Sequence, residues 1–503
     1  MRKIIILIWI VLLSQAVQGF GQVGFNKIYD LNTISSGFFN GIYIDGDLYL
    51  ATSLLHDSIF GLQGVGLVKS DTNGNILNTY SYFDPSGIDM GVGENFSIIK
   101  NSSGHIVFTG EYFSIKRGYI IIWSVQGELI NLINFDYDID YNQSELLETS
   151  DGYLLGGSNL PATSELRDFV TKIDKQGNVI WTKSYGDDPD LTYNMQQLSR
   201  LDDNTFVVAS VIGEGFIWGQ SHIYAIDSLG AIKWDFKGPI LTETAVTCIQ
   251  HLENGRWLYA TSDINVSINP PYSPSWNKLV CRDSSWNLVW EKRISPTNWW
   301  RNQTFDMKPS PDGNFVVAAR WAPGPGPEEP QWIGGCLYKI SPEGEEIWRF
   351  CDSVYWPEPP GYAEPFAGGL VVLPSGSVVF IGRTEWYAPQ PARTYGWMYK
   401  VDANGCRYEP CSVGLSTPNS MALKLEVFPN PAQDQLSIRL PYLSEEALVQ
   451  VLDPMGRTVL QMPVPSAQEN VQLWLGEYPA GLYAIRLMQK GRLLGVGKVL
   501  LMR

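Results

Sequence analysis

The chain has little positive charge, few histidines and few cysteines. Its 503 residues include 36 Lys and Arg against 52 Asp and Glu, a formal net charge of −16, together with 4 His and 6 Cys. A chain this acidic is poorly suited to bind the phosphate backbone of a nucleic acid or an anionic membrane surface. Charged residues make up 17% and hydrophobic residues 44%, which excludes a disordered chain.

Motifs of enzyme chemistry are also missing. The sequence has no Gly-x-Ser-x-Gly elbow, no His-Glu-x-x-His pair, no phosphate-binding glycine loop and no Cys/His spacing typical of zinc. A general base needs a partner that orients it, and none is identifiable for the histidines. These are His56, His105, His222 and His251. We therefore predict no catalytic residue, no cofactor and no metal site.

One acidic segment carries alternating carboxylates, at Asp136, Asp138 and Asp140. Spaced carboxylate oxygens can bind Ca²⁺, but the glycine and the bidentate glutamate of an EF-hand loop are missing here. We favour a solvated acidic connection, and the same interpretation applies to GDDPD at 186–190.

The hydrophobic run near the start, Ile4–Leu13, is too short to span a bilayer, which takes about 20 residues. It follows Arg2 and Lys3 and precedes small residues, which is the pattern of a secretory signal peptide. We predict a signal peptide over residues 1–21 and an exported, soluble protein without a transmembrane anchor.

A repeat fills the middle of the chain. An apolar segment, an Asp-x-x-Gly type turn and a second segment that often holds Trp recur seven times, with turn positions at 74, 127, 177, 230, 286, 344 and 405. Each copy follows another hairpin, so each repeat supplies four strands. Four strands per repeat of this length are typical of a β-propeller blade. We predict an all-β fold with a seven-bladed β-propeller over residues 22–411.

Three further features bear on how the blades meet. Residues 24–32 resemble the fourth strand of the repeats, so we expect them to complete the last blade and close the ring. Trp181, Trp234, Trp290 and Trp348 share one repeat position, which favours packing between blades over a ligand cage. At position 286 Trp replaces the turn glycine; because a left-handed backbone would be strained there, we expect a different turn.

The even number of cysteines agrees with an oxidising export route. Cys406 and Cys411 are close enough in sequence for a disulfide, which we predict. Cys336 and Cys351 lie on opposite arms of one hairpin, where a disulfide is possible but the register is open. Cys248 and Cys281 belong to strands that are not neighbours, so we expect buried free thiols.

The end of the chain has a different character. A polar linker at 412–422 leads into alternating strands over 423–503, which predict a small Ig-like β-sandwich. Four motif elements follow in order: Phe428-Pro429-Asn430-Pro431-Ala432, a turn at Gly456, Pro479-x-Gly481-x-Tyr483, and a closing strand at Lys498.

With these elements the segment resembles the C-terminal sorting domain of the type IX secretion system, type A. The resemblance implies passage across the outer membrane of a Gram-negative cell and docking of this domain on the secretion machinery. It also implies that the domain is usually removed by proteolysis, with the cargo released or held at the cell surface.

Long aromatic connections in the second half of the repeats suggest a ligand surface. We predict ligand contacts from Trp299, Trp300, Trp321, Trp356 and Trp386, because rigid aromatic rings hold sugars and peptides well. The alternative is that these rings only pack their own loops together. The predicted function is a secreted or cell-surface binding or scaffold protein that recognises an extracellular glycan or protein. The alternatives are an extracellular polysaccharide hydrolase or lyase on the same fold and a purely structural surface protein.

Overall fold

The computed structural model describes the chain from residue 24 to residue 502 with gaps. The ranges are 24–31, 36–55, 62–92, 97–112, 117–136, 140–160, 166–186, 188, 190–214, 217–240, 246–264, 275–294, 303–321, 334–353, 363–386, 393–407, 423–440, 446–453, 458–466, 468, 470–489 and 492–502. The predicted signal peptide and linker lie outside these ranges. The residues of the chain make contacts within two compact units, residues 1–412 and residues 413–503.

Within its described residues the first unit consists of seven antiparallel sheets. The inner strands are β2 (Phe38–Ile44), β6 (Met90–Gly91) with β7 (Ile98–Lys100), β11 (Asp140–Glu148), β15 (Thr192–Asp202), β19 (Cys248–His251), β23 (Gln303–Pro309) and β27 (Ala363–Val372). The second strands are β3 (Asp47–Leu55), β8 (Ile106–Tyr112), β12 (Gly152–Leu160), β16 (Thr205–Glu214), β20 (Trp257–Ile264), β24 (Phe315–Trp321) and β28 (Val378–Trp386).

The other two strands of each sheet lie farther from the centre. The third strands are β4 (Gln63–Asp71), β9 (Arg117–Trp123), β13 (Arg167–Asp174), β17 (Ile217–Asp227), β21 (Ser275–Arg282), β25 (Gly334–Ile340) and β29 (Arg393–Val401). The outer strands are β5 (Ile76–Tyr82), β10 (Leu129–Asp136), β14 (Val179–Tyr185), β18 (Ile232–Lys237), β22 (Leu288–Arg293), β26 (Glu346–Ser353) and β1 (Phe25–Tyr29).

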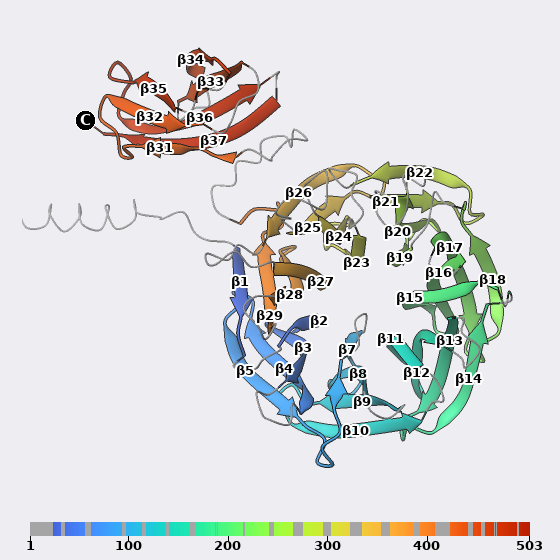
Figure 1. The fold of residues 1–503 in the computed structure, drawn as a ribbon. Coiled ribbons are helices and arrows are strands. Elements are labelled where there is room, and N and C mark those ends of the chain that lie inside the picture. Colours follow the sequence, from blue (N-terminus) through green and yellow to red (C-terminus); the bar gives the residue numbers. More distant parts are fainter. Residues whose placement is uncertain are drawn as a thin grey trace, which may run out of the picture. The chain divides into compact units, whose positions relative to one another are not determined.

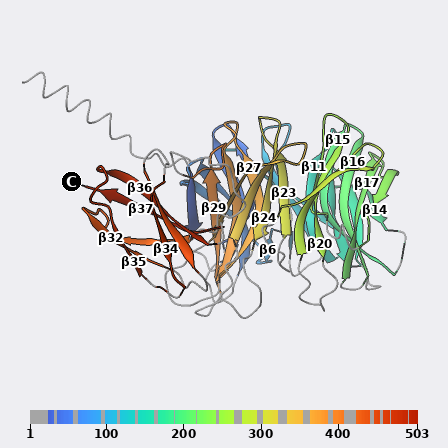
Figure 2. The ribbon, with the colours of Figure 1, turned by 90° about the horizontal axis from the view of Figure 1, so that it is seen from above.

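The sheets follow one another around a common axis, with their inner strands toward the centre (Figure 1). Seen from the side, the strands of this unit run between its two faces (Figure 2). The third strands form much of the core because both faces of each sheet are covered by its neighbours. In β25, for example, every residue is buried, whereas β18 on the outside alternates between exposed and half-buried positions. An apolar run of this kind is typical of a strand buried on both faces.

The chain closes the ring with its own first strand. β1 pairs antiparallel with β29, so that Phe25 lies opposite Lys400 and Tyr29 opposite Gly396. The expectation that residues near 24–32 complete the last sheet is therefore confirmed. Tyr29 also reaches the first sheet, where its hydroxyl donates a hydrogen bond of 2.8 Å to the carbonyl of Gly74. The outer strand of the last sheet thus joins that sheet to the first one.

The same kind of contact recurs between other sheets. The turn after a third strand places a glycine at positive φ against a ring from the outer strand of the preceding sheet. A Cβ atom at the glycine would lie within 3.0 Å of that ring. The pairs are Gly127 with Tyr80, Gly230 with Trp181, Gly344 with Trp290 and Gly405 with Trp348. The repeated aromatic position therefore lies between sheets.

The expectation about Trp286 is wrong. The backbone amide of Trp286 donates to the carbonyl of Asp283 at 3.0 Å and its φ is 64°, so this turn matches those of the other repeats. The left-handed conformation costs about 1–2 kcal/mol for a residue other than glycine. Aromatic packing offsets this cost: the Trp286 ring stacks on Phe236 at 4.4 Å and on Trp257 at 5.5 Å, each with an interplanar angle of 6°.

The second unit has two sheets in its described residues. One has the order β30-β37-β36-β33-β34 and the other β31-β32-β35. Their buried side chains form one apolar cluster drawn entirely from this unit. The strands are β30 (Leu423–Lys424), β31 (Glu426–Phe428), β32 (Gln435–Arg439), β33 (Ala447–Leu452), β34 (Thr458–Val464), β35 (Asn470–Trp474), β36 (Gly481–Gln489) and β37 (Arg492–Leu501).

Candidate functional site

The inner strands present polar side chains at matching places around the axis. We call these residues the polar collar: Asn40, Ser97, Glu145, Gln197, Cys248 and Asp306. A shift of strand register directly precedes Asn40, Glu145, Gln197 and Asp306 in their strands. Such β-bulges re-aim the side chain that follows. The local backbone therefore aims these polar side chains toward the centre of the ring.

The polar collar surrounds a cavity of about 360 Å³ at the centre of the sheets. Small-molecule sites in proteins begin near this size, at about 300 Å³. Further lining groups include the amide of Gln303, the hydroxyl of Thr304, the ring of Phe305 and the ammonium group of Lys308. The cavity thus offers donors, acceptors and one aromatic face.

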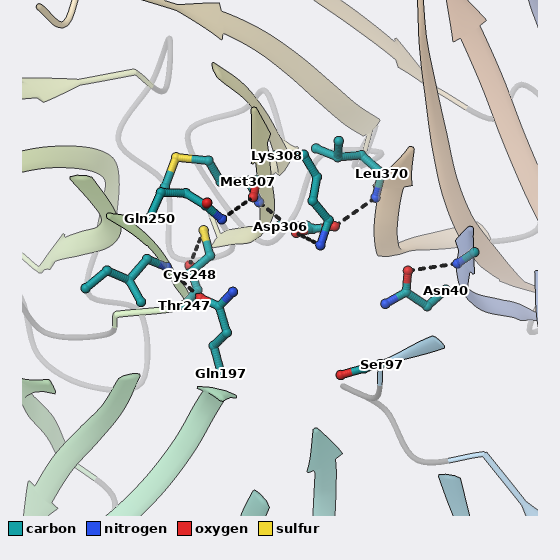
Figure 3. A network of polar contacts seen from close by, with 12 residues as sticks. Asn40, Ser97, Gln197, Thr247, Cys248, Gln250, Asp306, Met307, Lys308 and Leu370 are labelled. Atoms are coloured by element: carbon teal, nitrogen blue, oxygen red, sulfur yellow. Dashed lines mark hydrogen bonds and ion pairs between the residues drawn. The ribbon is translucent and has the colours of Figure 1, made fainter. Parts of the chain in front are cut away.

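Several collar side chains tie one sheet to the next (Figure 3). Gln197 Oε1 accepts a hydrogen bond from the amide of Ile249 at 2.6 Å, and Ser97 Oγ accepts one from the amide of Leu146 at 3.1 Å. Each amide belongs to the inner strand of the following sheet. These side chains replace backbone pairing that the separate inner strands cannot make with one another.

Asp306 makes the same link and also carries an ion pair (Figure 3). Its Oδ2 accepts from the amide of Leu370 at 3.1 Å, and its Oδ1 lies 3.2 Å from Lys308 Nζ. The charge of Asp306 raises the pKa of Lys308 above its ordinary value. The ammonium group therefore stays charged beside the cavity.

Glu145 stands apart from these links. Within the described residues its carboxyl takes a hydrogen bond from the Ser97 hydroxyl rather than from the backbone of the following sheet. Burial raises the pKa of Glu145 to about 7, although the Ser97 hydrogen bond and the charge of Lys308 act in the opposite direction. A carboxyl group that titrates near neutral pH therefore faces the cavity.

The cysteines lie in three different settings. Cys336 and Cys351 form a disulfide between β25 and β26, where they are directly opposite in register. Cys248 and Cys281 are free and buried, and burial raises the pKa of Cys248 to about 12. Cys406 is also disulfide-bonded. Cys411 lies outside the described residues, so the Cys406–Cys411 pairing stays a prediction.

For the five tryptophans predicted to bind a ligand, the structure describes at most the backbone. Trp299, Trp300 and Trp356 lie outside the described residues. Trp321 is the last residue of β24 and Trp386 the last of β28, and only their backbone is described. The aromatic ligand surface therefore stays a prediction, separate from the polar collar.

The acidic segment and the histidines give no common site. Asp136 ends β10 and Asp140 begins β11, while Asp138 lies outside the described residues. Across the described ranges, no group of three or more His, Cys, Asp and Glu side chains is placed to hold a metal ion. His222 is buried beside Tyr193 and Tyr224 in the fourth sheet.

The second unit shows what the Pro-Asn-Pro element does. Asn430 Nδ2 donates to the carbonyl of Lys498 at 2.8 Å, and Asn430 Oδ1 accepts from the amide of Leu500 at 3.0 Å. The side-chain amide thereby pairs with the edge of β37 as a neighbouring strand would. Pro429 and Pro431 flank Asn430 and follow cis peptide bonds.

The second motif element is held by a tyrosine. The Tyr483 hydroxyl donates to the carbonyl of Pro479 at 2.8 Å, and its ring is buried in the apolar cluster of this unit. Gly481 begins β36, the strand that carries Tyr483. Gly456 lies outside the described residues. The described motif residues therefore act on the two adjacent strands β36 and β37.

Solved structures similar to this chain include a mutant of puromycin hydrolase, at 12% identity and a TM-score of 0.44 over 82% of this chain. The chain spans 60% of that protein. The β-propeller domain of the Trilobed protease from Pyrococcus furiosus matches at 12% identity and a TM-score of 0.38, over 76% of this chain and 99% of that one. An arabinofuranosidase from Fusarium graminearum matches at 14% identity and a TM-score of 0.36, over 61% and 91%. No curated protein matches the sequence.

The part of the chain that the structure describes contains no helix long and apolar enough to cross a membrane. Residues 426–500 match the family of secretion system C-terminal sorting domains. This match covers the segment that carries the Pro-Asn-Pro element, Tyr483 and Lys498. The C-terminal segment is therefore a sorting domain of the type IX secretion system, and it directs the protein to the cell surface or to the medium.

Proposed function

We propose that the protein is an exported seven-bladed β-propeller that binds an extracellular glycan or protein. The seven sheets would be its blades, residues 22–411 the binding domain, and residues 423–503 an Ig-like domain that serves export. The observation that carries the proposal is the cavity of about 360 Å³, which is lined by polar side chains of the inner strands. Concave sites with a few convergent polar groups are typical of ligand binding.

The test is retention of the full mature chain on immobilised glycans and on extracellular protein extracts. We expect a restricted set of glycans or one protein class to retain it. Substituting Trp299, Trp300 and Trp356 together by Ala should weaken retention if the aromatic connections take part, with an unchanged melting temperature. If the unsubstituted chain is retained by no glycan and no protein, the proposed function is wrong.

A second candidate is hydrolysis or elimination on an extracellular polysaccharide. It is favoured by two carboxyl groups, Glu145 and Asp306, that line one cavity from strands on opposite sides of the ring (Figure 1). A carboxyl with a pKa of about 7 could act as an acid beside Asp306, which is ion-paired with Lys308.

The measurement is release of reducing or unsaturated ends from a polysaccharide panel by the full chain. For an enzyme we expect turnover that Glu145→Gln lowers by at least about a hundredfold, the scale of general acid–base catalysis. Equal turnover by this variant would remove Glu145 from the reaction, and no turnover by the unsubstituted chain would leave the binding function.

A further inference from the structure

Three residues of the polar collar join one sheet to the next. Ser97, Gln197 and Asp306 each accept a backbone hydrogen bond from the inner strand of the following sheet. A polar side chain at this position is explained there by the need to pair a buried amide. The three linking residues are a serine, a glutamine and an aspartate, so the link does not require a particular charge.

Glu145 occupies the same position without making this link. Its carboxyl is half-buried and accepts from the Ser97 hydroxyl. Burying a carboxylate without a cation in contact is unfavourable, as the pKa of about 7 indicates. Groups kept in such surroundings are concentrated at binding and catalytic sites. The backbone link to the following sheet therefore does not account for Glu145, whose hydrogen bond with Ser97 joins its sheet to the preceding one.

The surroundings of Glu145 suit a ligand with several hydroxyl groups. Lys308 supplies N–H donors, Gln303 supplies an amide with both donor and acceptor atoms, and Phe305 supplies a flat apolar face. Sugar rings present hydroxyls along their edge and C–H groups on their face, which this lining complements. The cavity of about 360 Å³ has room for a ligand of one or two sugar rings.

We propose that the central cavity binds a neutral sugar, and that the Glu145 carboxylate accepts hydrogen bonds from its hydroxyl groups. This inference rests on the proposed function and deepens it, because it assigns the site and the ligand class. It also distinguishes Glu145 from the three collar residues that accept a backbone hydrogen bond from the following sheet.

Binding of this kind depends on pH. The titratable or charged groups around the cavity are Asp306 and Lys308 on β23, Cys248 on β19 and Arg200 on β15. Asp306 is ion-paired with Lys308, and the pKa of Cys248 is raised to about 12, so Glu145 is the group whose charge changes near neutral pH. Hydroxyl donors need the ionised carboxyl, so affinity rises with pH and is lost as Glu145 takes up a proton.

The experiment is titration calorimetry of the full mature chain with methyl glycosides of glucose, mannose, galactose and xylose, and with cellobiose. With a pKa of about 7, ionised Glu145 falls about 25-fold between pH 7.5 and pH 5.5, and affinity should fall with it. Glu145→Gln should bind about tenfold more weakly at pH 7.5 and lose the pH dependence, because hydrogen bonds to a charged acceptor are the stronger ones.

The matched control is Glu148→Gln on the same strand. Glu148 accepts hydrogen bonds from the amide and hydroxyl of Ser102, at 2.6 and 2.7 Å, and does not line the cavity. This variant should bind like the unsubstituted chain. If Glu145→Gln binds a sugar as tightly as the unsubstituted chain does at pH 7.5 and shows the same pH dependence, the assignment of Glu145 is wrong while the binding function stands. If none of the sugars binds, the ligand class is wrong; retention on a protein partner would still support the proposed function.

Discussion

Deleting residues 423–503 will leave the β-sheet ring folded but held in the periplasm. The apolar cluster of the second unit is drawn from residues 425–501, and the clusters of the first unit use none of them. Removal of the tail therefore takes no side chain from the first unit's core. Cell fractionation of the native bacterium should show the truncated chain absent from the surface and the medium, with an intact melting transition.

A point variant tests whether export depends on the Pro-Asn-Pro element itself or only on the presence of residues 423–503. Asn430→Ala removes both side-chain hydrogen bonds to β37. We expect reduced export with an unchanged ring. The matched control is Gln435→Ala, whose side-chain amide donates to Gln472 at an exposed place. Normal appearance of the truncated chain outside the cell would contradict the role of this domain.

Gly405→Ala will destabilise the ring far more than Gly255→Ala. Both glycines end the same kind of turn, with φ of 77° and 78°. A Cβ at Gly405 would lie 2.6 Å from the Trp348 ring, whereas a Cβ at Gly255 meets no atom within 4 Å. Each alanine costs about 1–2 kcal/mol for its left-handed backbone, and crowding adds about 1–3 kcal/mol at Gly405 alone.

The measurement is urea unfolding of the full mature chain, followed by tryptophan fluorescence. Gly255→Ala serves as the matched control. It has the same energetic cost of a left-handed backbone, but its new Cβ meets no residue of another sheet. The difference between the two variants therefore reports on the contact of Trp348 with the following sheet. Equal losses of stability would show that the aromatic position does not hold the sheets together.

Much of the ring could be predicted from sequence because its signals are local. Asp-x-x-Gly turns and alternating apolar segments mark each hairpin, and the four-strand repeat follows from their spacing. Closure by β1 was predictable as well, since residues 24–32 read like an outer strand. The left-handed turn at Trp286 could not be predicted, because it is stabilised by stacking on two distant residues. Phe236 lies on the outer strand of the preceding sheet, and Trp257 lies on the second strand of the same sheet. Single turns do not reveal such long-range compensation.

The polar collar was missed, although a signal for it exists in the sequence. Aligning the repeats on their first hairpin turn places Asn40, Ser97, Glu145, Cys248 and Asp306 four residues before the first residue of each turn, and Gln197 five residues before it. An alignment of the repeats cannot show which of these residues bond to the backbone of the next sheet and which only line the cavity. Whether such a residue joins two sheets or faces the cavity depends on the direction of its side chain after a β-bulge. That direction is set by packing across the axis.

The pairing of β1 with β29 has a consequence for the order in which the protein matures. Phe25 lies near the start of the chain, whereas its partner Lys400 is made only after the strands of the other six sheets. Until then β1 has no partner strand, and the ring of Phe25, which is buried in the folded protein, lacks the contacts that cover it. The two ends of the ring can therefore pair only late, and closing so long a stretch of chain is slow. Any helper that shields these ends during transit would protect the chain from joining with another copy of itself.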